Sequence, residues 1–154
     1  MGKRSPEAHI MTKKSAFDDM IADLQQQIDQ QEDENFSPTV LKEYRHPSNF
    51  CLMEDPDAVG KIKGPCGDTM MIMLKIHQQK ITKICFWTDG CGTSVACGSM
   101  LTKLIKGQSI EDVAKIKSED LNRALDGLPD THVHCTLLAV NTLKKALQSL
   151  ENSQ

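Results

Sequence analysis

The sequence is organised around residues 69–88, TMMIMLKIHQQKITKICFWT. Every second residue of the first half is firmly apolar, and the second half is rich in β-branched and aromatic residues, so each half predicts a β-strand. Only the polar residues 77–80 separate the halves, and so short a connection joins neighbouring antiparallel strands. The stretch therefore predicts a hairpin whose apolar face is formed by Met70, Ile72, Leu74 and Ile76.

The two open ends of this hairpin carry residues suited to metal chemistry. Cys66 and Asp68 lie in a turn made with two glycines and a proline, just before the first strand. Cys91 follows the second strand between two glycines. Because the open ends of a hairpin are neighbours in space, we expect these three side chains to lie close together.

A third segment, His134-Cys135, adds an imidazole and another thiol. Cys91 and Cys135 both fall at or just before a predicted helix start, where unpaired amides and the helix dipole favour a thiolate. Permanent structural zinc sites typically contain C-x-x-C pairs, and the sequence has none. The donors are dispersed instead, and the carboxylate of Asp68 is a weak ligand for thiophilic metals, so the pattern favours a site that loads and releases its occupant. His132 is interpreted as a loop residue outside this site.

The other three cysteines receive different interpretations. No export signal is visible, so we expect a reducing, cytoplasmic compartment and free thiols. Cys85 lies within the second strand and is predicted to be a buried core residue. Cys97 is interpreted either as a small core residue, which is favoured, or as an additional thiol near the site, and the role of Cys51 is left open.

The bulk composition is that of an ordinary globular domain. The 154 residues are 39% apolar and 25% charged, and no apolar run reaches the ~18 residues that a membrane span needs. A net charge of −3 argues against nucleic acid as the main partner. We therefore expect no nucleic-acid partner and no membrane partner.

A first strand and several helices are predicted around the hairpin. Residues 59–63 form a short strand that leads into it. Ser15 opens an amphipathic helix of about 16 residues, interpreted as packing on the core, and a polar, acidic linker follows this helix. Further helices are expected at residues 38–45 and 92–106, after Ser109, from Ser118 to Gly127, and at residues 135–150.

Three separate motifs, in this order, resemble the IscU/NifU N-terminal family of iron–sulfur cluster assembly scaffold proteins: Cys66-Gly67-Asp68, Gly90-Cys91-Gly92 and His134-Cys135. The likeness runs from about Ser37 to Leu150. It implies an α+β fold in which a small three-stranded antiparallel sheet packs against several helices, with the extra N-terminal helix outside the family pattern. Residues 1–36 are accordingly expected to form an N-terminal extension, and residues 37–154 the scaffold domain.

The resemblance implies a scaffold and not an enzyme, with a [2Fe-2S] cluster built transiently on Cys66, Cys91 and Cys135. Asp68 or His134 would lie near the fourth ligand position, and zinc can occupy family sites of this kind in place of the cluster. Sulfur would arrive as a persulfide from a cysteine desulfurase, with Cys135 as the candidate acceptor, and the cluster would pass to recipient apoproteins. The protein would act as a monomer or a dimer.

Two alternatives come from other functional classes. One is a zinc-bound persulfide acceptor, a sulfurtransferase that stimulates a cysteine desulfurase, although no long insertion follows Cys91 as in the zinc-dependent branch. The other is a zinc-stabilised interaction module without sulfur chemistry. Many family members also carry Leu-Pro-Pro-Val-Lys before the His-Cys pair, a stretch read by an Hsp70-type chaperone. Residues 127–133 keep one proline and lack the lysine, which weakens the expectation of chaperone-driven transfer.

Overall fold

The computed structural model describes residue 16 and residues 19–23, 36–65 and 67–152. The chain divides into two units, residues 1–35 and residues 36–154, which are described separately. In the first unit, Ala16 and residues 19–23 are helical, within the helix predicted from Ser15. The rest of that helix lies outside the described residues, so its proposed packing on the core stays a prediction.

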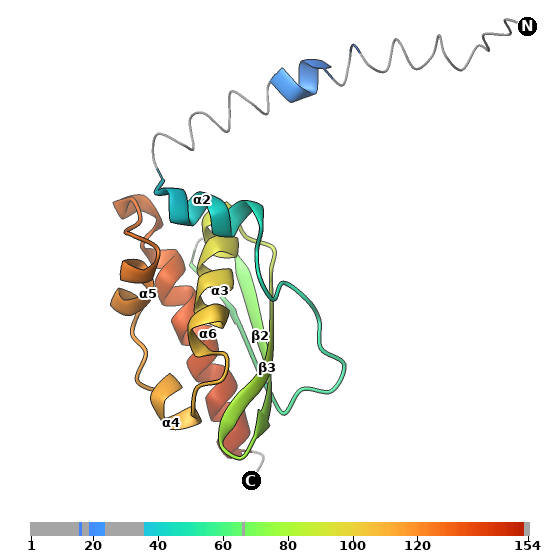
Figure 1. Cartoon of the computed structure of the whole chain (residues 1–154), viewed down its shortest axis with the longest axis vertical. Coiled ribbons are helices and arrows are strands. Elements are labelled where there is room, and N and C mark those ends of the chain that lie inside the picture. The colour runs from blue at the N-terminus through green and yellow to red at the C-terminus, as the bar shows by residue number, and fades with distance from the viewer. Residues whose placement is uncertain (1–15, 17–18, 24–35, 66, 153–154) are drawn as a thin grey trace, which may run out of the picture. The chain divides into compact units, whose positions relative to one another are not determined.

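Three antiparallel strands form the sheet of the second unit, in the order β1 (Ala58–Lys63), β2 (Thr69–His77) and β3 (Lys80–Thr88) (Figure 1). The predicted hairpin is β2–β3, so this prediction is confirmed. Gln78 and Gln79 close it, with φ angles of 54° and 66°. Two consecutive residues with positive φ suit a tight two-residue hairpin turn, because they match the right-handed twist of the strands.

One face of the sheet forms the core, and it is the face predicted from the alternation. Met70, Ile72 and Leu74 are fully buried. The helices α3 (Gly92–Ile105) and α6 (His134–Asn152) pack against the sheet (Figure 1). The packing is close enough that a Cβ at Gly60 of β1 would overlap the backbone of α6.

The remaining helices confirm the predicted positions to within a few residues. Ser37 caps α2 (Pro38–Arg45) by accepting a hydrogen bond from the Val40 amide, and Ser109 caps the short α4 (Ile110–Val113) in the same way. α5 spans Ser118–Ala124, and a 3-10 turn, η1 (Asp130–His132), precedes α6. No sequence pattern predicted this turn. No helix in the described part of the chain is both long and apolar enough to cross a membrane.

Helix α2 holds α3 in position through contacts to both halves of that helix. The Glu43 carboxylate is only 2% exposed, accepts a hydrogen bond of 2.7 Å from the Ser99 hydroxyl and forms an ion pair with Lys103. The ring of Tyr44 fills the space at Gly92, where a Cβ would overlap it. A paired buried carboxylate and a ring packed on glycine leave α3 little freedom to shift against α2.

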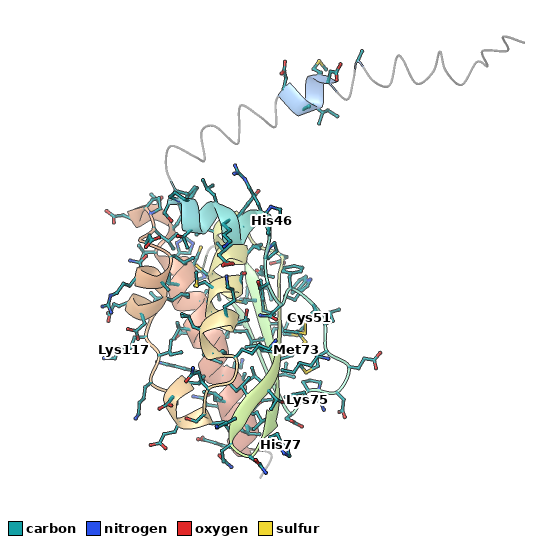
Figure 2. The ribbon with its side chains drawn as sticks, viewed as in Figure 1. His46, Cys51, Met73, Lys75, His77 and Lys117 are labelled. Carbon is teal, nitrogen blue, oxygen red and sulfur yellow. A yellow bond between two sulfur atoms is a disulfide. The ribbon has the colours of Figure 1, made fainter. Side chains whose placement is uncertain are left out.

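The expectation of free thiols is wrong for Cys51 and Cys85, which form a disulfide (Figure 2). Residues 49–51 run beside β3, where the Cys51 amide donates to the Phe86 carbonyl and the Phe86 amide donates to the Asn49 carbonyl. This pairing brings the two cysteine Cα atoms to 5.2 Å, within the range that a disulfide requires. Cys85 is buried, as predicted.

Reduction of this disulfide should lower the free energy of unfolding by about 2–4 kcal/mol, because the bond closes a 34-residue separation and restricts the unfolded chain. Urea unfolding with and without reductant measures the difference. Cys51→Ser changes an exposed residue, so this variant should unfold like the reduced protein and should not respond to reductant. Equal stability of the oxidised and reduced wild-type protein would contradict the prediction.

Candidate metal centre

Two helix N-termini meet at the site. Cys91 is the N-cap residue of α3, three residues beyond the end of β3, and its side chain is exposed. Cys135 is the second residue of α6 and is fully buried. Both thiols therefore lie at the positive end of a helix, as predicted.

Cys91 and Cys135 form a potential metal-binding group with His132. Each residue offers one ligand atom, and these atoms all lie within 4.8 Å of one another. The structure therefore places His132 beside these thiols, although the sequence interpretation left it outside the site. One signal could have found it, because His132 precedes Cys135 by three residues, and residues at this spacing share a face once the chain is helical. The turn η1 followed by α6 supplies that helical path.

The Ser94 hydroxyl connects the Asp68 carboxylate to the Cys135 thiol. The buried Ser94 hydroxyl donates a hydrogen bond of 3.1 Å to Asp68 Oδ2 and lies 3.6 Å from Cys135 Sγ. A Cβ at Gly90 would come within 2.6 Å of Asp68 Oδ2, so the carboxylate packs closely against this glycine. The open ends of the hairpin are therefore adjacent at Asp68 and Gly90, as the strand pairing predicted.

His134 lies next to Cys135, whereas the position of Cys66 is not described. His134 Nε2 lies 3.6 Å from Cys135 Sγ, and the His134 side chain borders a cavity of about 230 Å³ together with Pro65 and Leu137. Cys66 lies outside the described residues, so its role as a ligand stays a prediction. The turn around it is defined on both sides, since the Gly64 amide donates to the Asp68 carbonyl at 2.7 Å.

The pKa values of the two site thiols are shifted in opposite directions. The facing Cys135 thiol lowers the pKa of Cys91 to about 4, aided by the Thr93 and Ser94 amides and opposed by partial burial. The same contact and burial raise the pKa of Cys135. The pair therefore shares one proton near neutral pH, and exposure favours the negative charge on Cys91 over the buried Cys135.

Cys97 differs from both of these thiols. Its side chain is fully buried on α3, and burial raises its pKa. It is not part of the group formed by Cys91, His132 and Cys135 among the described residues. These observations fit the favoured interpretation of Cys97 as a small core residue.

This donor set fits iron or zinc. Thiolate and imidazole are the ligands that these ions accept in proteins, whereas a carboxylate is the weaker partner for a thiophilic ion. The exposed thiol of Cys91 gives an incoming ion a first contact, and the Ser94 hydroxyl lies between Asp68 and Cys135. The arrangement can therefore receive a thiophilic ion from solvent and hold it between two helix ends.

Alkylation by iodoacetamide should modify Cys91 before Cys97 and Cys135, because Cys91 is exposed and already a thiolate. Its rate should change little between pH 6 and pH 8, whereas an ordinary thiol reacts about tenfold faster per pH unit in this range. Peptide mapping by mass spectrometry gives the rate at each cysteine. Cys135→Ala removes the largest cause of the low pKa and should restore part of the pH dependence. A tenfold rise per pH unit at Cys91 of the wild-type protein would contradict the assignment.

Comparisons with known proteins identify the family of this chain. The family model described as the NifU-like N terminal domain matches residues 35–154. Iron–sulfur cluster assembly scaffold protein IscU 1 from Archaeoglobus fulgidus is 38% identical over 113 residues, which cover 73% of this chain and 74% of the relative. IscU of Buchnera aphidicola subsp. Acyrthosiphon pisum is 32% identical over 124 residues, which cover 77% of this chain and 97% of the relative.

Solved structures show the same fold. The N-terminal part of a NifU-like protein from Brucella abortus has a TM-score of 0.61 at 17% identity, covering 77% of this chain and 95% of that one. A candidate scaffold protein of the SUF system from Fervidobacterium islandicum has a TM-score of 0.61 at 19% identity, covering 73% and 96%. From the matched family model and the identity to curated relatives, the chain belongs to the NifU-like N-terminal domain family, which includes the IscU scaffold proteins.

Proposed function

We propose that this protein is a scaffold on which an iron–sulfur cluster is assembled and from which it is passed to recipient proteins. The observation that carries the proposal is the convergence of Cys91, Cys135 and an imidazole, with the Asp68 carboxylate one hydroxyl away. The relatives with similar sequences are named iron–sulfur cluster assembly scaffold proteins. The alternative, a zinc-bound sulfurtransferase, is therefore not favoured.

The cluster is the cargo of this site, and its proposed ligands differ in how strongly they bind iron. Cys91 and Cys135 are the firm ligands among the described residues, and Cys66 is the third predicted cysteine. A [2Fe-2S] cluster has four protein ligand positions, so one position falls to a histidine or to Asp68. A carboxylate binds thiophilic iron weakly, and a cluster held partly by Asp68 can be given away.

Sulfur delivery requires a cysteine desulfurase as partner. In the transfer step the acceptor thiolate attacks the outer sulfur of the desulfurase persulfide. The old S–S bond breaks, the desulfurase cysteine leaves as a thiolate, and the acceptor carries the new persulfide. Cys135 was predicted as the acceptor from its helix N-terminus and the adjacent His134. Cys91 is the exposed thiolate, so persulfide mapping should compare these two cysteines directly.

Anaerobic incubation with ferrous iron, cysteine, a desulfurase and dithiothreitol, which reduces the persulfide sulfur to sulfide, should produce a visible sulfur-to-iron charge-transfer spectrum, with bound iron and acid-labile sulfide in equal amounts. Cys91→Ser should abolish the spectrum. Cys51→Ser, in which the altered cysteine belongs to the disulfide and not to the site, should retain it. A wild-type protein that takes up zinc but no iron and sulfide would contradict the scaffold function.

The same preparation tests the role of Asp68. Asp68→Ala should carry a longer-lived cluster, measured as slower transfer to an apo-ferredoxin and slower bleaching by a chelator. Asp55→Ala is the control, because the Asp55 side chain is 98% exposed on the segment before β1. A cluster lost from Asp68→Ala as fast as from the wild-type protein would exclude Asp68 as the labile ligand.

A further inference from the structure

Residues 52–57, termed the strap, connect the edge of β3 to β1 across the outer face of the sheet (Figure 1). At the start of the strap, Cys51 is bonded to Cys85 of β3. At its end, the Asp57 amide donates to the Leu74 carbonyl of β2 at 2.8 Å, next to the pairing of β1 with β2. Helices α3 and α6 cover the inner face of the sheet, so the strap crosses the opposite face.

The strap buries one row of side chains that point away from the core. Met73 and Cys85 are register partners on β2 and β3, and their neighbours along each strand point into the core. The Met53 amide of the strap lies 3.4 Å from Met73 Sδ. Met73 is 3% exposed and Cys85 is 2% exposed, although Val59 and Lys83 on the same face are exposed. The strap is therefore what shields Met73 and Cys85 from water.

The disulfide is the strongest connection between the start of the strap and the sheet. The Met53 contact uses a thioether sulfur, which is a weak acceptor. Asp55 lies 3.7 Å from Lys75, but the Asp55 side chain is 98% exposed, and an exposed ion pair contributes little stability. The Leu52 side chain is 69% exposed, so it adds little burial. Without the covalent bond, contacts as weak as these permit local opening of the strap.

We propose that Cys51 is a site of thiol–disulfide exchange with an external dithiol, and that opening of its disulfide releases the strap from the sheet. Cys51 is exposed and Cys85 is buried, so an external thiolate has access to the Cys51 sulfur. Exposed disulfides are the exchangeable ones in proteins. This inference goes beyond the scaffold function and does not rest on it, because the bond contains none of the proposed metal ligands.

The exchange proceeds in two steps and transfers two electrons to the protein. One thiolate of the external dithiol attacks Cys51 Sγ, the Cys51–Cys85 bond breaks, and Cys85 leaves as a thiolate that takes up a proton. The second thiolate then attacks the mixed disulfide, Cys51 leaves and is protonated, and the external dithiol becomes a disulfide. The backbone hydrogen bonds between residues 49–51 and Phe86 do not involve the sulfur atoms, so they keep the two thiols close enough for reoxidation.

Trapping of the mixed disulfide tests the site of attack. The oxidised wild-type protein is incubated anaerobically with a thioredoxin whose second active-site cysteine is replaced by serine, and the mixed disulfide is mapped by mass spectrometry. The thioredoxin should be joined to Cys51 at least about 10-fold more often than to Cys85, because burial shields the second sulfur. Attachment mainly to Cys85, or no reaction at either cysteine, would overturn the assignment of Cys51.

Release of the strap is tested with Cys51→Ser, which leaves Cys85 as a free thiol beneath the strap. Alkylation of Cys85 by N-ethylmaleimide should be at least about 10-fold faster than that of Cys97, a thiol buried on α3 that serves as the internal reference for global unfolding. Equal alkylation rates of Cys85 and Cys97 would show that the strap stays closed without the disulfide.

Amide hydrogen exchange gives a second measurement that needs no substitution. In the reduced wild-type protein, residues 51–57 should exchange at least about 10-fold faster than in the oxidised protein, at times so early that the amides of α6 are still protected. Exchange in residues 51–57 that does not change on reduction would overturn the release of the strap. Neither outcome bears on the scaffold function, which is measured by cluster assembly.

Discussion

The register between β2 and β3 is the constraint on which the site depends. Met70 pairs with Thr88 at the open end of the hairpin, so the chain enters β2 and leaves β3 at the same end of the sheet. Side chains fasten this end: the Thr88 hydroxyl donates to the Thr69 carbonyl at 2.7 Å, and the Thr69 amide donates to Asp89 Oδ1 at 2.7 Å. A slip of one residue would turn the apolar face of β2 outward, so burial of that face fixes the register and with it the location of the site.

Helices α3 and α6 bring metal-binding side chains to this end of the sheet. α3 starts directly after the hairpin, which puts Cys91 at its N-cap, and α6 begins alongside it with Cys135 in its first turn. The buried Ser94 hydroxyl connects Asp68 to Cys135, and the Glu43–Lys103 pair ties α3 to α2. Each donor comes from a different element, so a rigid frame supports ligands that can still release an ion.

Sequence patterns predicted those features that depend on local or hairpin geometry. Apolar residues at every second position of β2 identified the core face, and the Ser37 and Ser109 caps identified helix starts. The adjacency of Asp68 to the Cys91 segment followed from the pairing of two neighbouring strands. Each of these depends on residues close in sequence or on a connection too short to allow another arrangement.

The features that escaped prediction depend on contacts that no local pattern records. The Cys51–Cys85 bond arises because residues 49–51 run beside β3, and an irregular segment carries no periodic signal for such pairing. His132 was set aside because a single 3-10 turn has no apolar period either, although it aligns His132 with Cys135. The structure thus brings one more imidazole close to the two thiols than the sequence motifs indicate.

The central claim is that Cys91, Cys135 and an imidazole bind one ion. X-ray absorption at the zinc K-edge of the protein loaded with one equivalent of Zn²⁺ tests it most directly. The expected result is a mixed shell, with at least two sulfur atoms at about 2.3 Å, nitrogen or oxygen at about 2.0–2.1 Å, and the multiple scattering of a bound imidazole. A shell of oxygen alone, or of sulfur without the imidazole signature, would contradict it.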